Sequence, residues 1–192
     1  MAFRCAVASV QLRLKEGAEG RVLDSEIVRA AEILMPIAHD AGAAFLINDR
    51  ADIAKVVGAD GVHLGQSDGS LAEARDLLGP DASIGVTCNA SRHLAFEAGD
   101  GGADYVAFGA FFATATKKTR HHAEPEILTW WADLAEIPCV AIGGITPENA
   151  GALAKAGAHF VAASAAIWDH AEGPAAAVRA FNKVLEAAAR EV

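Results

Sequence analysis

Short runs rich in β-forming residues alternate with longer stretches of helical periodicity along this chain. Strict alternation of strands and helices is typical of a parallel sheet with right-handed helical crossovers. We therefore predict an α/β fold with about seven strand–helix repeats. The predicted strands are 6–11, 44–48, 61–64, 83–87, 105–109, 139–143 and 160–164, and the predicted helices are 25–41, 50–57, 70–78, 91–99, 125–135, 147–156 and 173–190.

The last two predicted strand ends favour a TIM barrel over an open doubly wound sheet. One ends in Ala-Ile-Gly-Gly-Ile at 141–145 and the other in Ala-Ala-Ser-Ala-Ala at 162–166. Glycines let backbone N–H groups approach phosphate oxygens, and TIM barrels place phosphate sites after their last strands. The Gly-Gly pair taken alone also fits a plain tight turn. We predict a TIM (β/α)8-type barrel, with residues 1–192 forming a single domain.

Composition excludes several classes of protein. The formal net charge of −9 over 192 residues opposes non-specific binding to nucleic acids or anionic membranes. No apolar stretch is long enough to span a membrane. Three scattered cysteines without CxxC spacing argue against a disulfide framework, and the isolated histidines argue against a zinc site. We expect a soluble, cytoplasmic protein whose ligands are small molecules.

Three polar side chains stand on alternate residues where the first predicted strand ends. Gln11, Arg13 and Lys15 would share one face of an extended chain. Arginine offers a planar fork and lysine a point charge, so the group suits an anion with several oxygens. The same pattern also fits an edge strand with a solvated polar face.

Two acidic residues follow the next two predicted strands. Asp49 stands beside Asn48, and Asp68 follows a Gly-Gln-Ser turn. Carboxylates on neighbouring strand ends suit Mg²⁺, which takes one or two carboxylates together with water and phosphate oxygens. Each aspartate also precedes a predicted helix, so helix capping is the competing explanation. The neighbouring cations favour a site for magnesium and diphosphate.

Hydroxyl groups and a lysine follow later strands. Thr87 closes the fourth predicted strand, and the segment after the fifth contains Thr114, Thr116 and Lys117. These three residues could clamp an oxyanion. A solvated loop is the alternative for this segment.

Taken together, these strings resemble the thiamine-phosphate synthase family, in its alphaproteobacterial form. The strings are QLRLK, LINDR, GVHLGQSD, IGVTCN, ADYVAFGAFFATATKKT and CVAIGGIT, followed by the late Ser-Ala segment. They occur in the order that the family has, from about residue 8 to residue 168. The resemblance implies a TIM barrel that joins hydroxymethylpyrimidine diphosphate to thiazole phosphate, giving thiamine phosphate and diphosphate.

The resemblance also implies roles for single residues. Arg13, Lys15 and Lys117 would be catalytic. Mg²⁺ would be the cofactor, held by Asp49 and Asp68. The diphosphate would be bound by Gln11, Arg13, Lys15, Asn48 and Lys117, the pyrimidine and thiazole phosphate would lie near Thr87, Thr114 and Thr116, and the thiazole phosphate would be held by Gly144 and Ser164.

The chain departs from the family pattern at Thr87, Asn89, Ala113 and Ala163, which bear on substrate fit. Family members also have an additional strand and helix before the QxRxK strand. Either Met1 is a misplaced start, or this first unit is absent and the barrel has an open seam with exposed strand edges. For the 192-residue chain we expect low stability or self-association into a homo-oligomer.

Two other functions fit the scaffold. One is an isomerase resembling thiazole tautomerase, and the other is a non-catalytic thiazole phosphate-binding protein. The isomerase would need no paired metal-binding carboxylates and no cation cluster, and the short start of the chain is the reason for considering the non-catalytic protein.

Overall fold

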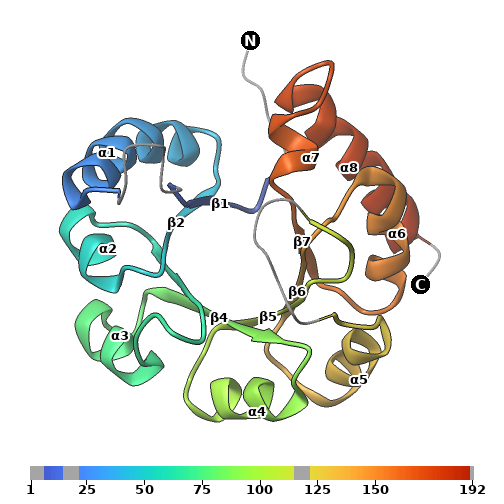
Figure 1. Ribbon diagram of the computed structural model, residues 1–192, viewed down its shortest axis with the longest axis horizontal. Helices are drawn as coiled ribbons and strands as arrows, with labels where there is room; N and C mark the ends of the chain where they lie inside the picture. Colours follow the sequence, from blue (N-terminus) through green and yellow to red (C-terminus); the bar gives the residue numbers. More distant parts are fainter. Residues whose placement is uncertain (1–6, 15–21, 115–121, 191–192) are drawn as a thin grey trace. The chain divides into compact units, whose positions relative to one another are not determined.

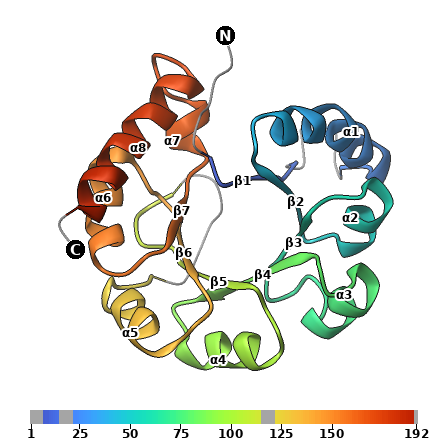
Figure 2. The ribbon, with the colours of Figure 1, turned by 180° about the vertical axis from the view of Figure 1, so that it is seen from behind.

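The computed structural model describes residues 7–14, 22–114 and 122–190. The chain comprises two compact units, residues 1–86 and 87–192. Figures 1 and 2 show strands alternating with helices in both units. The prediction of one domain over residues 1–192 stays a prediction.

The first unit contains parallel strands in chain order. They are β1 (Ser9–Leu12), β2 (Ala44–Asn48), β3 (Gly61–Leu64) and the first half of β4 (Ser83–Asn89). The register pairs Leu12 with Ile47, Asn48 with His63 and Leu64 with Val86. The carboxyl ends of these strands therefore lie side by side, which is the edge where such folds assemble their sites.

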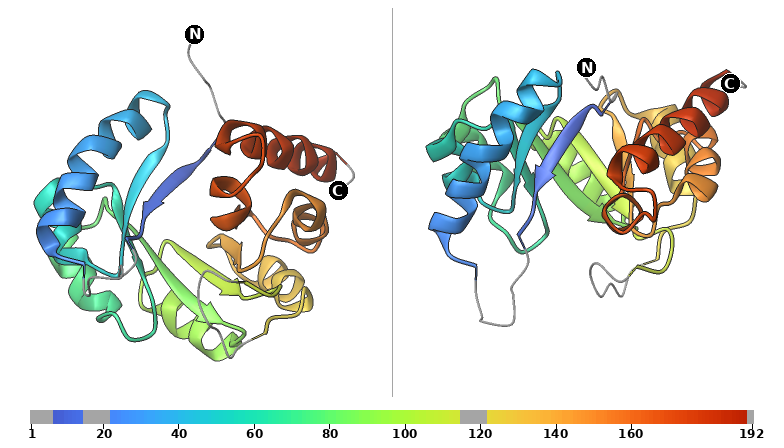
Figure 3. Two further views of the ribbon diagram at one scale, coloured as in Figure 1. Left: turned by 45° about the horizontal axis from the view of Figure 1, so that its top comes forward. Right: turned by 90° about the horizontal axis from the view of Figure 1, so that it is seen from above.

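Three helices join these strands and cover one face of them (Figures 1 and 3). They are α1 (Asp24–Asp40), α2 (Ala51–Val57) and α3 (Leu71–Leu78). The core between the layers consists of apolar side chains from the strands and, from the helices, of alanines together with larger residues such as Ile53. Phe45, Ile47, Val62 and Ile84 in it are inaccessible to solvent. Alanine keeps the helices close to the sheet, so the strand ends are held rigidly.

The second unit repeats the arrangement. After β4 it contains α4 (Arg92–Asp100), β5 (Tyr105–Gly109), α5 (Glu126–Leu134), β6 (Cys139–Ile142), α6 (Pro147–Lys155), β7 (Phe160–Ala162), α7 (Ala165–Trp168) and α8 (Pro174–Ala189). Strands β5, β6 and β7 are parallel and paired in that order. Trp131 of α5 is buried against Phe108 of β5, with ring centroids 5.8 Å apart, and α6 packs against α8.

The predicted elements are confirmed within the described residues. All seven strands are present, and β2, β3 and β5 have the predicted bounds. The first described strand is the one that contains Gln11. Two differences are that β4 extends to Asn89 and that the short helix α7 follows Ser164, where the sequence predicts strand.

Candidate active site

Side-chain hydrogen bonds join the ends of β1 and β2. Gln11 Nε2 donates to Asn48 Oδ1 at 2.6 Å, and Asn48 Nδ2 donates to Asp49 Oδ2 at 2.5 Å. Three of the predicted site residues are thus held in one hydrogen-bonded row. Arg13, one residue beyond β1, is exposed and is not part of this row, while Lys15 lies outside the described residues.

Asp49 occupies a turn that only some residues tolerate. Its φ of 64° lies in the left-handed region, which aspartate adopts more readily than most non-glycine residues. The Asp49 amide donates to the His63 carbonyl of β3 at 2.8 Å, and the Arg50 amide donates to the Asn48 carbonyl at 2.9 Å. These backbone bonds turn the chain sharply after β2 and fix the position from which the Asp49 carboxylate extends.

The carboxylates of Asp49 and Asp68 meet at Gly65. A Cβ placed on Gly65 would be 2.2 Å from Asp68 Oδ2 and 3.8 Å from Asp49 Oδ1. The two carboxylate oxygens therefore cannot be farther apart than the sum of these distances. The close approach needs a residue without a side chain, and Gly65 supplies it.

Helix capping does not explain these two aspartates. The N-cap residue of α2 is Arg50, and that of α3 is Ser70, whose hydroxyl accepts from the Glu73 amide. The capping interpretation of Asp49 and Asp68 is therefore wrong. Among the described residues no group of three or more His, Cys, Asp or Glu side chains could hold a metal ion. The pair instead offers two hard oxygen ligands, a set that suits Mg²⁺ only when substrate oxygens and water complete it.

In the second unit, the loop after β6 packs against the loop after β5. Gly144 has a φ of 67°, and a Cβ there would lie 2.5 Å from the Ala113 carbonyl oxygen and 2.7 Å from Phe112 Cβ. The Phe112 amide donates to the Gly143 carbonyl at 3.1 Å. Gly144 is thus beside the segment that leads to Thr114, so two predicted substrate-binding segments lie together.

Asn149 holds the Gly144 loop on the start of α6. Its Oδ1 accepts from the Thr146 amide at 2.9 Å, and its Nδ2 donates to the Gly144 carbonyl at 3.0 Å. The sequence signal for this role is the T-x-x-N spacing before a helix, which resembles a capping box. This spacing indicates helix capping and gives no sign that Asn149 also holds the Gly144 loop.

The remaining predicted site residues are placed as follows. Thr87 is half-buried in β4, Thr114 is half-buried in the loop after β5, and Ser164 is the exposed N-cap residue of α7, where its hydroxyl makes no capping bond. Thr116 and Lys117 lie outside the described residues. The prediction that they form a clamp with Thr114 stays a prediction.

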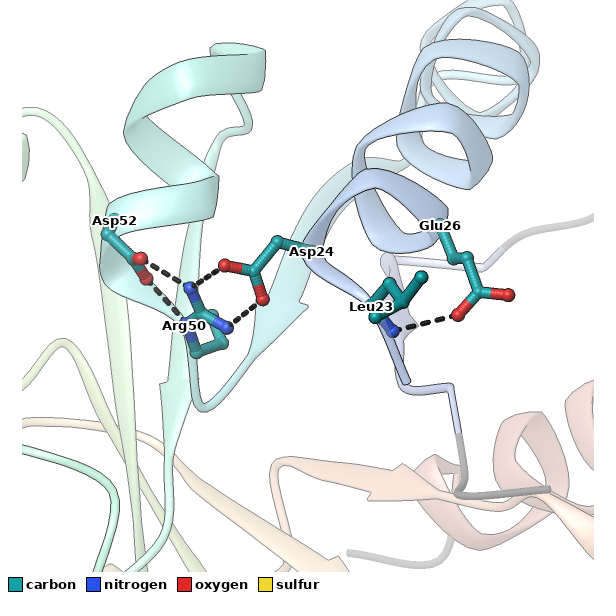
Figure 4. A network of polar contacts seen from close by, with 5 residues as sticks. All are labelled: Leu23, Asp24, Glu26, Arg50 and Asp52. Atoms are coloured by element: carbon teal, nitrogen blue, oxygen red, sulfur yellow. Dashed lines mark hydrogen bonds and ion pairs between the residues drawn. The ribbon is translucent and has the colours of Figure 1, made fainter. Parts of the chain in front are cut away.

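A second feature that the sequence did not reveal is an arginine between two aspartates (Figure 4). Arg50 donates four hydrogen bonds, two to Asp24 and two to Asp52, at 2.5–2.8 Å. The hydrogen bonds that Arg50 donates, first to Asp24 and then to Asp52, raise the pKa of its guanidinium, and the bond from Arg50 lowers the pKa of Asp52. Asp24 is 26 residues away in the chain, so no local motif indicates this contact.

The described thiols are unsuited to nucleophilic catalysis. Cys88 and Cys139 are buried, and neither is in a disulfide. Burial raises the pKa of Cys88 to about 12, and burial also raises the pKa of Cys139. A protonated thiol is a poor nucleophile.

None of the described helices combines the length and the apolar character that crossing a membrane requires.

Comparison with known sequences assigns the chain to a family. A family profile described as thiamine monophosphate synthase matches residues 1–167. The thiamine-phosphate synthase of Rhodospirillum centenum is 55% identical over 179 residues, covering 93% of this chain and 84% of that protein. The thiamine-phosphate synthase of Hyphomonas neptunium is 51% identical over 183 residues, covering 95% of this chain and 82% of that protein.

A solved structure extends the agreement to the fold. The thiamine phosphate pyrophosphorylase of Pyrococcus furiosus superposes with a TM-score of 0.83 at 30% identity, covering 96% of this chain and 86% of that one. The predicted α/β fold of the TIM-barrel type is confirmed. Together with the family profile, these similarities show that the chain belongs to the thiamine-phosphate synthase family, transferases that carry out a condensation in thiamine biosynthesis.

Proposed function

We propose that this protein condenses 4-amino-2-methyl-5-hydroxymethylpyrimidine diphosphate with thiazole phosphate in a Mg²⁺-dependent reaction. The observation that carries the proposal is the convergence of the Asp49 and Asp68 carboxylates at Gly65. Two carboxylates held beside each other repel unless a cation lies between or near them. A protein that bound only a monophosphate would gain nothing from this arrangement.

The residues present fit magnesium. Asp49 and Asp68 would hold the ion, with the diphosphate oxygens and water as the other ligands. When bound, the ion would neutralise charge on the departing diphosphate. Asn48 keeps the Asp49 carboxylate oriented through the bond from its Nδ2.

Side chains around this pair would bind the diphosphate. Gln11 in β1 donates to the Asn48 side chain, and Arg13 directly follows the strand. From the family resemblance we assign Lys15 and Lys117 to the same group. Their charges would stabilise the diphosphate most strongly as negative charge accumulates on it, which lowers the barrier to its departure.

The thiazole phosphate would bind through the second unit. The backbone at Gly144 and the hydroxyl of Ser164 are assigned to its phosphate, with Thr87, Thr114 and Thr116 near the ring and the pyrimidine. The close approach of Gly144 to the 112–113 segment, which leads to Thr114, supports this assignment.

The chemical step breaks the bond between the pyrimidine methylene carbon and the diphosphate oxygen, whose electron pair leaves with the diphosphate. The thiazole nitrogen then forms the new C–N bond with its lone pair. Because this nitrogen carries no proton, no general base is needed. The protein has to stabilise the leaving charge and exclude water from the cationic carbon.

The test is release of diphosphate and formation of thiamine phosphate from the two substrates with and without Mg²⁺. We expect turnover only with the metal, and a loss of about 100-fold or more in Asp68→Asn. Asp76→Asn, an exposed aspartate on α3, is the matched control and should behave as the wild type. Metal-independent turnover, or full activity of Asp68→Asn, would refute the proposal.

The two alternative functions give different results in this assay. A tautomerase-like isomerase would convert the thiazole phosphate without releasing diphosphate. A non-catalytic protein would bind thiazole phosphate without turnover. Either result would replace the synthase assignment.

We also propose that the protein acts in the cytoplasm, in keeping with the absence of a disulfide at Cys88 and Cys139, the cysteines that the structure describes. Self-association remains part of the proposal, and sedimentation of the purified chain tests it.

A further inference from the structure

We propose that Arg50 is a positioning residue for the metal site, holding Asp49 in place through its paired contacts with Asp24 and Asp52 (Figure 4). The inference rests on the proposed role of Asp49 as a magnesium ligand. It assigns a function in catalysis to three charged residues that no motif of the sequence connects.

First, the turn after β2 makes the Asp49 side chain sensitive to its neighbour Arg50. Asp49 has a φ of 64°, a conformation that costs free energy in any residue but glycine. Arg50 follows directly, as the N-cap residue of α2, and its carbonyl accepts from the Ala54 amide. The direction of the Asp49 side chain therefore depends on how firmly the next residue is held.

The second step is the geometry of the Arg50 side chain. Nη1 and Nη2 donate to the two oxygens of Asp24 at 2.5 and 2.8 Å, and Nε and Nη2 donate to the two oxygens of Asp52 at 2.8 and 2.5 Å. A guanidinium gripped by two carboxylates in its own plane has one orientation, whereas a single ion pair leaves it free to rotate.

The third step is which elements are joined. Asp24 is the first residue of α1, and Asp52 is in the first turn of α2. The start of α1 is itself fixed, because the Leu23 amide donates to Glu26 at 2.8 Å (Figure 4). Arg50 thus ties the turn after β2 to the starts of two helices.

Stability alone does not account for this arrangement. The side chains of Arg50, Asp24 and Asp52 are 30%, 60% and 58% exposed, and ion pairs at such exposure contribute little to the free energy of unfolding. Replacing a residue that orients a metal ligand typically lowers metal affinity or activity by about 10–100-fold.

The experiment uses Mn²⁺ as a spectroscopic probe, with inorganic diphosphate present and no turnover. Mn²⁺ binding is measured by electron paramagnetic resonance for the wild type, Arg50→Gln, Arg50→Lys, Asp24→Asn and Asp49→Asn. We expect Arg50→Gln to weaken binding about 10-fold or more, with the melting temperature little changed. Lysine should restore part of the loss, because it keeps the charge but not the fork.

Control variants test whether an effect on Mn²⁺ binding comes from the Arg50 network itself. Arg29→Gln removes an exposed arginine of α1 outside this network and should bind Mn²⁺ as the wild type does. In a double-mutant cycle, Asp24→Asn should add little once Arg50 is glutamine. If Arg50→Gln fails to fold, Asp24→Asn carries the test alone.

The outcomes are distinct. Loss of binding in Asp49→Asn with unchanged binding in Arg50→Gln and Asp24→Asn would overturn the positioning role and leave the proposed function standing. Unchanged Mn²⁺ binding in Asp49→Asn would overturn the proposed metal site, and the positioning role with it.

Discussion

Gly65 lies against the carboxylate of Asp68, so close that a methyl group on Gly65 would be 2.2 Å from Asp68 Oδ2. The atom that would be displaced is the far end of a flexible side chain and not part of the backbone. Any additional atom at position 65 therefore moves a proposed metal ligand without forcing the sheet apart.

We predict that Gly65→Ala raises the Mg²⁺ concentration needed for half-maximal activity about 10-fold or more, while the melting temperature stays near that of the wild type. Gly61→Ala is the contrast, because a Cβ there would be 1.8 Å from the Ser83 carbonyl oxygen in the neighbouring strand. That variant should lose about 1–3 kcal/mol of stability. Equal stability losses in both variants would contradict the prediction.

A second prediction concerns Asn48, which accepts from Gln11 and donates to Asp49. Asn48→Asp keeps the acceptor but replaces the donor by a negative charge next to Asp49. We expect kcat/KM to fall by about 10–100-fold, with a smaller loss in Gln11→Ala, which removes only the outer bond. Steady-state kinetics at saturating Mg²⁺ measure both. A larger loss of kcat/KM in Gln11→Ala than in Asn48→Asp would contradict the prediction that the bond to Asp49 matters more than the bond from Gln11.

The strands could be predicted from sequence because buried parallel strands are continuous apolar runs bounded by turns. Strands β2, β3 and β5 are of this kind. Helix α7 could not, since the four residues Ala165–Trp168 continue the apolar pattern of β7 and are too short for helical periodicity to appear.

The site also has features that could be predicted from the sequence and features that could not. The proximity of Gln11, Asn48, Asp49 and Asp68 could be predicted because each stands near the carboxyl end of a strand, and parallel strands bring these ends together. The Arg50 network, the approach of Gly65 to Asp68 and the second bond of Asn149 depend on side-chain directions in three dimensions. No sequence pattern indicates these three contacts, since the T-x-x-N spacing at Thr146–Asn149 indicates only the capping bond of Asn149.

A third prediction separates the two bonds of Asn149. Asn149→Asp keeps the acceptor for the Thr146 amide and loses the donor to the Gly144 carbonyl, whereas Asn149→Ala loses both. We expect both variants to raise KM for thiazole phosphate, and only alanine to lower stability, by about 1 kcal/mol. Thermal unfolding and substrate saturation curves test this. A KM unchanged in both would remove the Gly144 loop from phosphate binding.

A fourth prediction concerns acid stability and Asp60, which accepts from the Phe45 amide at 2.6 Å and from His39 at 2.7 Å. Burial acts to raise the pKa of this carboxyl, but the hydrogen bonds from Phe45 and His39 outweigh it and lower the pKa. The group is then more acidic in the folded than in the unfolded chain, so its stabilisation is present above about pH 4. It is lost as the pH falls through the folded-state pKa.

Asp60→Asn, which keeps an acceptor for Phe45, should therefore be less stable than the wild type at neutral pH. The difference in unfolding free energy should shrink toward zero at the acid end, where the wild-type carboxyl is protonated too. Urea unfolding at a series of pH values measures this difference. A gap that stayed constant down to pH 2 would show that the charge of Asp60 is not its source.

The last prediction follows from the burial of Cys88 and Cys139. The pKa of Cys88 is raised to about 12, so almost no thiolate forms at pH 8. In a Cys5→Ser background, which leaves these two thiols alone, we expect alkylation by iodoacetamide to be slow in the native protein and fast in guanidinium chloride. Mass spectrometry of timed samples identifies the modified residue. Rapid native alkylation of Cys88 would mean that β4 opens readily, and it would contradict the burial of this thiol.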